Sequence, residues 1–140
     1  MRYFVLSPEV AGGLGKNTVM SRDRHPPTVA RLHYEIDVWL GDELLEGFPC
    51  FIVTSRLADA VRKSQLSGAA TGEVEVTLTD QFNELYPGRL IPKFMWLQVS
   101  GTAGIDDFGT DSTGRLVVSE RALRLLETMK LENCEVAGLG

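Results

Sequence analysis

The feature that most constrains this chain is a segment that occurs twice, at a spacing of 65 residues. Residues 51–66 read FIVTSRLADAVRKSQL, and residues 116–131 read LVVSERALRLLETMKL. Aligned without gaps, the segments agree in apolar or polar class at fifteen of sixteen positions, and only Ser64 against Met129 differs. Each starts with a short apolar run and continues with Thr54 or Ser119, residue types that cap helices. Apolar residues at helical spacing follow. We therefore predict a strand–helix unit that is used twice.

The rest of the chain reads mainly as strands. Alternating apolar residues across 32–38 and 73–79 predict half-exposed strands, which are typical of antiparallel sheets. In this pattern His33 is predicted to point away from the core. Residues 94–99 are apolar on both faces, while residues 11–16 and 101–114 are predicted to be loops. Gly68 is predicted to end the first helix in a left-handed conformation. These patterns predict one α+β domain over residues 1–140, with a mixed, mostly antiparallel sheet and two main amphipathic helices.

Charge and apolar content narrow the classes of partner. The formal net charge of −5 disfavours nucleic acid, because phosphate binding needs a basic surface. No apolar run approaches the roughly 20 residues of a membrane helix, so no membrane partner is predicted. Two cysteines, Cys50 and Cys134, are too few for a disulfide framework or a metal cluster. The expected location is the cytoplasm.

The acidic loop at residues 101–114 is the best candidate for chemistry. It does not fit a calcium-binding loop, because a glycine occupies the position of the first ligand. A metal-dependent enzyme or binder would need Asp106, Asp107, Asp111 and Glu120 to converge on one point, and this stays open as an alternative. The sequence shows no Ser/His/Asp or Cys/His arrangement of the kind used in nucleophilic catalysis. We therefore predict a non-catalytic protein without cofactor or metal.

Three segments together resemble a known family. They are HYEIDVWLGDELLEGFPCFIVTSRLADAVRKSQLSG at residues 33–68, PKFMWLQVSGTAGIDDFG at 92–109 and RLVVSERALRLLE at 115–127. The most specific pieces are PCFIVT at 49–54, DDFG at 106–109 and LVVSERAL at 116–123. The chain resembles a bacterial family of immunity proteins that accompany polymorphic toxins. This resemblance implies a small cytoplasmic α+β protein that binds a cognate toxin and blocks it without catalysis.

A partner-binding surface can be predicted from the acidic residues. Toxins that act on nucleic acids are often basic, and negative potential would steer their association. The acids predicted to be exposed are Glu35, Asp37, Asp42, Glu43, Glu46, Asp106, Asp107 and Asp111. Trp39 falls on the polar side of its strand and is predicted to be an aromatic anchor, since such residues recur in interfaces. A structural or self-assembling role, with a homodimer formed along a sheet edge, is the third alternative.

Overall fold

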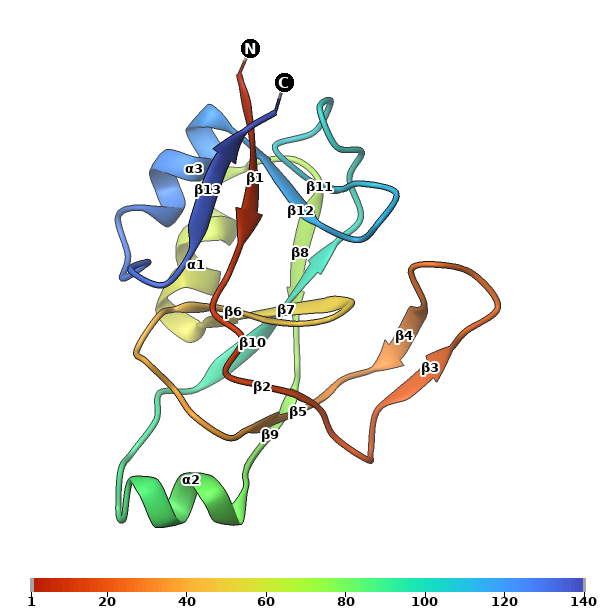
Figure 1. The fold of residues 1–140 in the computed structure, drawn as a ribbon. Helices are drawn as coiled ribbons and strands as arrows, with labels where there is room; N and C mark the ends of the chain where they lie inside the picture. The colour runs from red at the N-terminus through yellow and green to blue at the C-terminus, as the bar shows by residue number, and fades with distance from the viewer. Residues whose placement is uncertain (1, 140) are drawn as a thin grey trace.

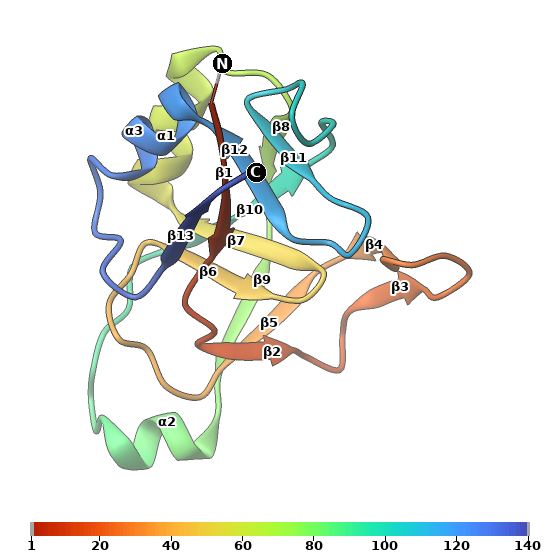
Figure 2. The same ribbon diagram turned by 45° about the horizontal axis from the view of Figure 1, so that its top comes forward.

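The computed structural model describes residues 2–139 and has a mixed α+β fold (Figures 1 and 2), which confirms the predicted fold class. Over these residues the chain forms thirteen strands and three helices. The strands are β1 (Tyr3–Ser7), β2 (Gly12–Leu14), β3 (Val19–Ser21), β4 (Thr28–Arg31), β5 (His33–Ile36), β6 (Leu44–Gly47), β7 (Cys50–Thr54), β8 (Ala69–Gly72), β9 (Glu75–Leu78), β10 (Phe94–Val99), β11 (Phe108–Thr110), β12 (Leu116–Ser119) and β13 (Glu135–Gly138). The helices are α1 (Ser55–Ser64), α2 (Asp80–Leu85) and α3 (Glu120–Leu126).

The repeated segment is part of a larger structural repeat. One four-stranded sheet has the order β6-β7-β10-β8, and another has the order β11-β12-β1-β13. We call β6, β7, α1, β8 and β10 the first unit, and β11, β12, α3, β13 and β1 the second unit. The strand register repeats as well, because Thr71 pairs with Leu97 in the first unit and Val136 pairs with Leu6 in the second. The prediction of a twice-used strand–helix unit is therefore confirmed.

The two units close into one ring of strands. Beyond β1, Glu9 bridges Leu45 of β6 in parallel, and beyond β10, Thr102 bridges Thr110 of β11 in parallel. With the antiparallel pairs, these bridges place β6, β7, β10, β11, β12 and β1 in a closed order. Within the ring each strand has a neighbour on both sides, whereas β8 and β13 lie outside it and end the two four-stranded sheets.

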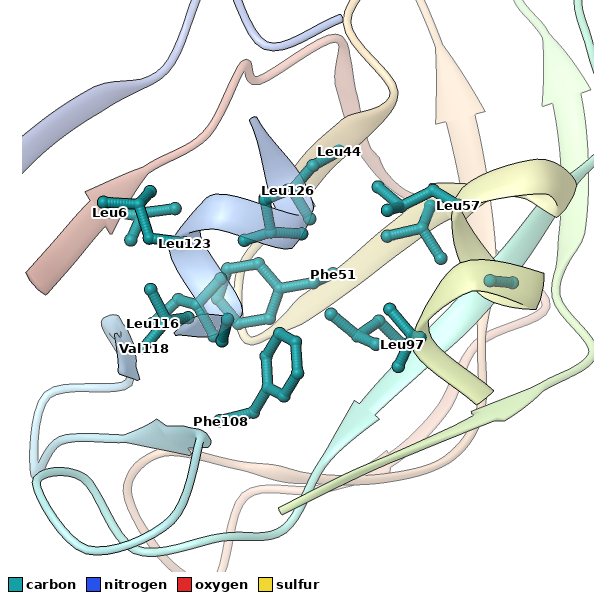
Figure 3. Close-up of a cluster of buried hydrophobic side chains, with 14 residues drawn as sticks. Leu6, Leu44, Phe51, Leu57, Leu97, Phe108, Leu116, Val118, Leu123 and Leu126 are labelled. Carbon is teal, nitrogen blue, oxygen red and sulfur yellow. The ribbon is translucent and has the colours of Figure 1, made fainter. Parts of the chain in front are cut away.

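Two amphipathic helices cover this ring and bury equivalent positions. The buried side chains are Leu57, Ala58 and Val61 in α1 and Ala122, Leu123 and Leu126 in α3, which lie 65 residues apart in pairs. They join one apolar cluster with residues of both sheets (Figure 3), in which Phe51 and Phe108 are fully buried. Burial of each large apolar side chain contributes roughly 1.5–3 kcal/mol. The repeated sequence is thus the scaffold of the fold.

Segments outside the units form a second layer. Strands β2, β5 and β9 make a three-stranded sheet in which β5 and β9 are parallel. Strands β3 and β4 form a two-stranded arm that projects from the body in both views (Figures 1 and 2). Helix α2 lies at the end of the molecule away from the two termini (Figure 1). None of the three helices in residues 2–139 is long and apolar enough to cross a membrane.

Two predictions for this layer are wrong. The glycine-rich residues 11–16 are not only a loop, because Gly12 to Leu14 form β2. A Cβ atom at Gly12 would lie 1.7 Å from the carbonyl oxygen of Glu35, so glycine is needed there for close strand approach. His33 is also buried rather than exposed. Its Nδ1 accepts a hydrogen bond from the backbone N–H of Asn17 at 3.2 Å, because the 15–18 connection covers this face of β5.

Two expected boundaries also differ. The predicted loop at residues 101–114 contains β11, which pairs with β12. Helix α1 ends earlier than expected, because Gln65 is the left-handed C-cap residue with φ of 59°. Gly68 is left-handed too, with φ of 91°, but it lies in the turn that leads into β8.

Candidate functional site

Three of the acids predicted to be exposed are buried. Asp42, Glu43 and Asp107 expose 0%, 6% and 3% of their surface, so this part of the surface prediction is wrong. The carboxylate of Asp42 accepts hydrogen bonds from the backbone N–H groups of Glu132 at 2.9 Å and Asn133 at 2.7 Å. A buried carboxylate needs such donors, because burial of an unpaired charge is very costly. These side chains serve the fold.

Asp107 joins the two units through hydrogen bonds from three residues. Ser119 Oγ donates to its Oδ1 at 2.7 Å, and Arg121 donates through Nε and Nη2, both at 2.8 Å. The backbone N–H of Ser67, which follows α1, donates to Oδ2 at 3.0 Å. We call this arrangement the Asp107 clamp. It links the start of α3 to the segment after α1.

Glu43 forms the equivalent arrangement with the roles of the two units exchanged. Thr54 Oγ1 donates to its Oε1 at 2.7 Å, and Arg56 donates through Nε and Nη2, both at 2.6 Å. The backbone N–H of Lys130, which follows α3, donates to Oε2 at 3.0 Å. We call this the Glu43 clamp. Each clamp therefore connects the helix N-cap residue and the nearby arginine of one unit with the segment that follows the helix of the other unit.

The donors in the clamps stabilise the ionised carboxylates. The hydrogen bonds from Arg56 are the main cause that lowers the pKa of Glu43 to about 2, against the opposing effect of burial. The Arg121 guanidinium likewise holds the pKa of Asp107 well below its usual range. Both groups are therefore charged at neutral pH.

The lowered pKa of Glu43 predicts a loss of stability in acid. A carboxyl group whose pKa is lower in the folded protein stabilises the fold above its unfolded pKa, and this contribution disappears as the pH falls through the folded value. For Glu43 the loss extends from 4.5, its ordinary value, to about 2. We expect the thermal unfolding midpoint, followed by circular dichroism, to fall steeply below pH 4.5. The fall should be smaller in Glu43→Gln and unchanged in Glu35→Gln, and parallel profiles for Glu43→Gln and wild type would contradict the assignment.

Asp106 and Asp111 brace the acidic loop. Asp106 Oδ2 accepts a hydrogen bond from the backbone N–H of Thr102 at 2.8 Å. Burial opposes ionisation of Asp111, yet hydrogen bonds from Thr113 and Arg115 lower its pKa to about 2. These are turn contacts of the kind that aspartate commonly makes.

The metal-dependent alternative requires these acids to converge, and they do not. Asp106, Asp107 and Asp111 bind separate donors, while Glu120 lies 3.5 Å from Arg124. Across residues 2–139, no three His, Cys, Asp or Glu side chains gather in a way that could hold a metal ion. The described part of the chain therefore lacks the ligand set that this alternative needs.

Besides Asp106 and Asp111, the predicted residues that keep surface access are Glu35, Asp37, Glu46 and Trp39, and these four are half-buried. No hydrogen bond or ion pair from residues 2–139 engages the carboxylates of Glu35 and Asp37. Burial raises the pKa of Glu46. Trp39 donates its indole N–H to the carbonyl of Asp42 at 2.9 Å and packs edge-on against Phe94. Of these four, Trp39 is fixed in position while part of its ring remains accessible.

Trp39 belongs to a larger exposed surface that sequence reasoning missed. The guanidinium of Arg89 stacks 4.8 Å from the ring centroids of both Trp39 and Tyr86, and its Nη1 donates to the carbonyl of Trp39 at 2.8 Å. The neighbouring leucines are exposed, at 57% for Leu40, 54% for Leu85 and 90% for Leu90. We call these six residues the α2-end surface. Asp37 lies two residues before Trp39, and Asp80 and Glu84 lie on α2 before Leu85; all three keep solvent access.

One sequence signal pointed toward this surface. Leu85 and Leu90 flank the turn at Pro87-Gly88 and belong to no apolar repeat, so the sequence pattern does not place them in the core. Pairing of Arg89 with Trp39 joins positions 50 residues apart, which only the fold brings together. In comparison with known proteins, the chain matches no family model and no curated sequence. The resemblance to immunity proteins therefore rests on the three segments alone.

Proposed function

We propose that this protein is an immunity protein that binds a basic cognate toxin through the α2-end surface and blocks it without catalysis. The observation that carries the proposal is the stack of Arg89 on Trp39 and Tyr86, three residues that each have an exposed leucine next to them in the chain. Tryptophan, tyrosine and arginine are the residues that most often dominate binding energy at interfaces. The proposed site of action is the cytoplasm.

The fixed geometry of the stack supports this assignment. Arg89 contacts two aromatic rings and donates to a backbone carbonyl, so much of its conformational freedom is already lost before binding. Preorganised side chains lose less entropy when a partner arrives. Leu90 has few contacts of its own at 90% exposure, and removing it from water on a partner surface would be favourable.

Charge supports a basic partner. The exposed acids Asp80 and Glu84 lie on α2, Asp37 lies two residues before Trp39, and the chain carries a net charge of −5. Complementary potentials raise association rates and select against partners of the wrong charge. The clamps contribute nothing to this effect at close range, because Glu43 and Asp107 are neutralised by Arg56 and Arg121.

Affinity purification from the native host, followed by mass spectrometry, tests the proposal. Recovery of one toxin encoded by a neighbouring gene supports it, and crosslinks should fall on the α2-end surface. Recovery of copies of this chain alone would contradict it and favour self-assembly. Strand β13 would then be the first edge to examine, since all four of its residues are exposed at the end of a sheet.

A substitution of Leu90 provides a sharper prediction. In Leu90→Lys, a cation replaces an exposed apolar side chain on a surface that is proposed to meet a basic partner. We expect the dissociation constant for the toxin to rise roughly 30-fold or more, the effect of losing about 2 kcal/mol at a hot spot. Calorimetry measures this change directly. The matched control is Ile105→Lys, at a residue that is 75% exposed in the 101–107 loop, and equal weakening by both variants would refute the assignment.

A further inference from the structure

A cavity of about 410 Å³ opens between the start of α1 and the segment that enters β10. The lining residues are Trp39, Gly41, Glu43, Thr54, Ser55, Arg56, Pro92, Lys93 and Lys130. Trp39 and Pro92 contribute apolar surface to it, and Arg56, Lys93 and Lys130 contribute three cationic side chains. Because Trp39 also belongs to the α2-end surface, the cavity lies directly beside the proposed interface.

Two of the three cations are not neutralised inside the protein. The Arg56 guanidinium is paired with the buried Glu43 carboxylate at 2.6 Å. The Lys93 ammonium lies 3.9 Å from Glu73, and the Lys130 ammonium lies 4.0 Å from Glu132. Both of these acids have side chains more than 70% exposed, so the pairs are weak surface contacts. The cavity is therefore positive within an acidic protein.

Lys130 lines the cavity beside Gly41. A Cβ atom at Gly41 would lie 2.9 Å from Lys130 Nζ, so the ammonium group lies directly over the Gly41 backbone. Glycine at this position, with φ of 112°, leaves the space that the ammonium group occupies. A cation held beside an apolar wall is suited to a carboxylate on an apolar body.

The second unit provides an internal comparison. The backbone N–H of Ser55 donates to the Lys93 carbonyl at 2.9 Å, and that of Glu120 donates to the Arg2 carbonyl at 3.1 Å. Ser55 and Lys93 in the first unit therefore correspond to Glu120 and Arg2 in the second. The second unit supplies its own carboxylate through Glu120, whereas the first has Ser55 at that place and one additional cation, Lys130, which aligns with Gln65. The difference leaves an unmatched positive site in the first unit only.

We propose that this cavity receives a carboxylate side chain of the protein partner. The inference rests on the proposed function, because the partner is the toxin that binds the α2-end surface. A basic partner surface would meet Asp37, Asp80 and Glu84, while one acidic side chain would enter between Lys93 and Lys130. This alternation of charge fixes the register of the complex and discriminates against toxins that lack the acid.

The carboxylate preference is testable without the toxin. The probe is 3-phenylpropionate, with the neutral 3-phenylpropanamide as its isosteric control, titrated into ¹⁵N-labelled protein and followed by NMR. We expect saturable shifts of the Trp39 indole and the Ser55 and Arg56 amides with the acid, at about tenfold higher affinity than with the amide. Equal affinity for both probes, or no saturable shift, would overturn the proposal.

Charge reversal assigns the effect to the two lysines. The double variant Lys93→Glu/Lys130→Glu should lose binding of 3-phenylpropionate, and Lys93→Gln/Lys130→Gln should weaken it. The control Lys16→Glu/Lys63→Glu changes net charge equally at exposed positions outside the cavity and should retain binding. Equal loss in both charge-reversed proteins would overturn the proposal, because it would report overall charge. Circular dichroism confirms that each variant is folded.

Toxin binding separates this inference from the proposed function. If wild-type protein binds the toxin and Lys93→Glu/Lys130→Glu binds it at least about tenfold more weakly than the Lys16/Lys63 control, the inference is supported. If both double variants bind the toxin as wild type does, the inference fails while the proposed function stands. If wild-type protein binds no toxin, the proposed function fails, and the role of the cavity as a partner site fails with it.

Discussion

Replacement of Asp107 by alanine is expected to lower the free energy of unfolding by about 3 kcal/mol. The side chain is 3% exposed and accepts hydrogen bonds from Ser119, Arg121 and the backbone of Ser67. Its removal leaves buried donors unpaired. It also breaks the connection between Ser67, which follows α1, and Ser119, the N-cap residue of α3. Urea unfolding monitored by circular dichroism measures the change.

Two neighbouring substitutions check the reason for this loss. Asp106→Ala removes a half-buried carboxylate that accepts one bond from Thr102, so its effect should be clearly smaller. Arg121→Met should also cost less than Asp107→Ala, because the exposed guanidinium leaves while Ser119 and Ser67 still satisfy the carboxylate. If Arg121→Met were as damaging as Asp107→Ala, the ion pair rather than the buried donors would dominate the clamp.

Replacement of Gly68 by alanine is the second large expected loss, at about 3 kcal/mol or more. Gly68 has φ of 91°, a conformation that side chains with a Cβ atom rarely adopt. Its Cβ would also lie 2.0 Å from the carbonyl oxygen of Phe108 and 2.9 Å from the Cβ of Asp106. The substitution therefore combines backbone strain with a collision against the strand that follows Asp107. Thermal and urea unfolding both measure it.

Gly88 is the matched control for this prediction. It has a similar positive φ of 71°, but no atom lies within 4 Å of the Cβ that alanine would add. Gly88→Ala should cost only about 1 kcal/mol, the penalty of the left-handed backbone alone. Similar losses for Gly68→Ala and Gly88→Ala would show that the close approach to Phe108 contributes little.

The repeated units and the proposed binding surface occupy different parts of the molecule. Each clamp joins one unit to the other, so the repeated architecture is used for stability. The α2-end surface lies on segments without a counterpart in the repeat, namely residues 39–40 and residues 85–90. The cavity lies at the boundary, where Ser55 replaces the acid that Glu120 provides in the second unit. We infer that specificity is carried by the parts that depart from the repeat.

The resemblance to immunity proteins and the geometry support the same proposal by different routes. The resemblance implies a toxin-binding protein, and its first segment, residues 33–68, contains Trp39 and Leu40. The geometry adds the fixed stack with Arg89 and an adjacent positive cavity. Together they change the proposed interface from a set of exposed acids to an aromatic and apolar surface.

The sequence by itself determined the features that depend on neighbours along the chain. Thr54 and Ser119 cap helices as predicted, because a cap needs only the backbone N–H groups of the following turn. The spacing of Leu57, Ala58 and Val61 likewise specified the buried face of α1, and the same pattern specified that of α3. The order of the residues alone therefore predicts the repeat.

Only the tertiary structure decided which polar residues are free. Asp42, Glu43, Asp107 and His33 look like surface residues in the sequence, yet donors from distant segments surround each of them. The tertiary structure also decides the position of Arg89, which lies over Trp39, 50 residues away in the sequence. Local pattern predicts which face of an element is apolar, but burial of a charge depends on partners that the folded chain brings from elsewhere. Contacts along the chain therefore predicted the scaffold, whereas the proposed binding surface depends on contacts between distant segments.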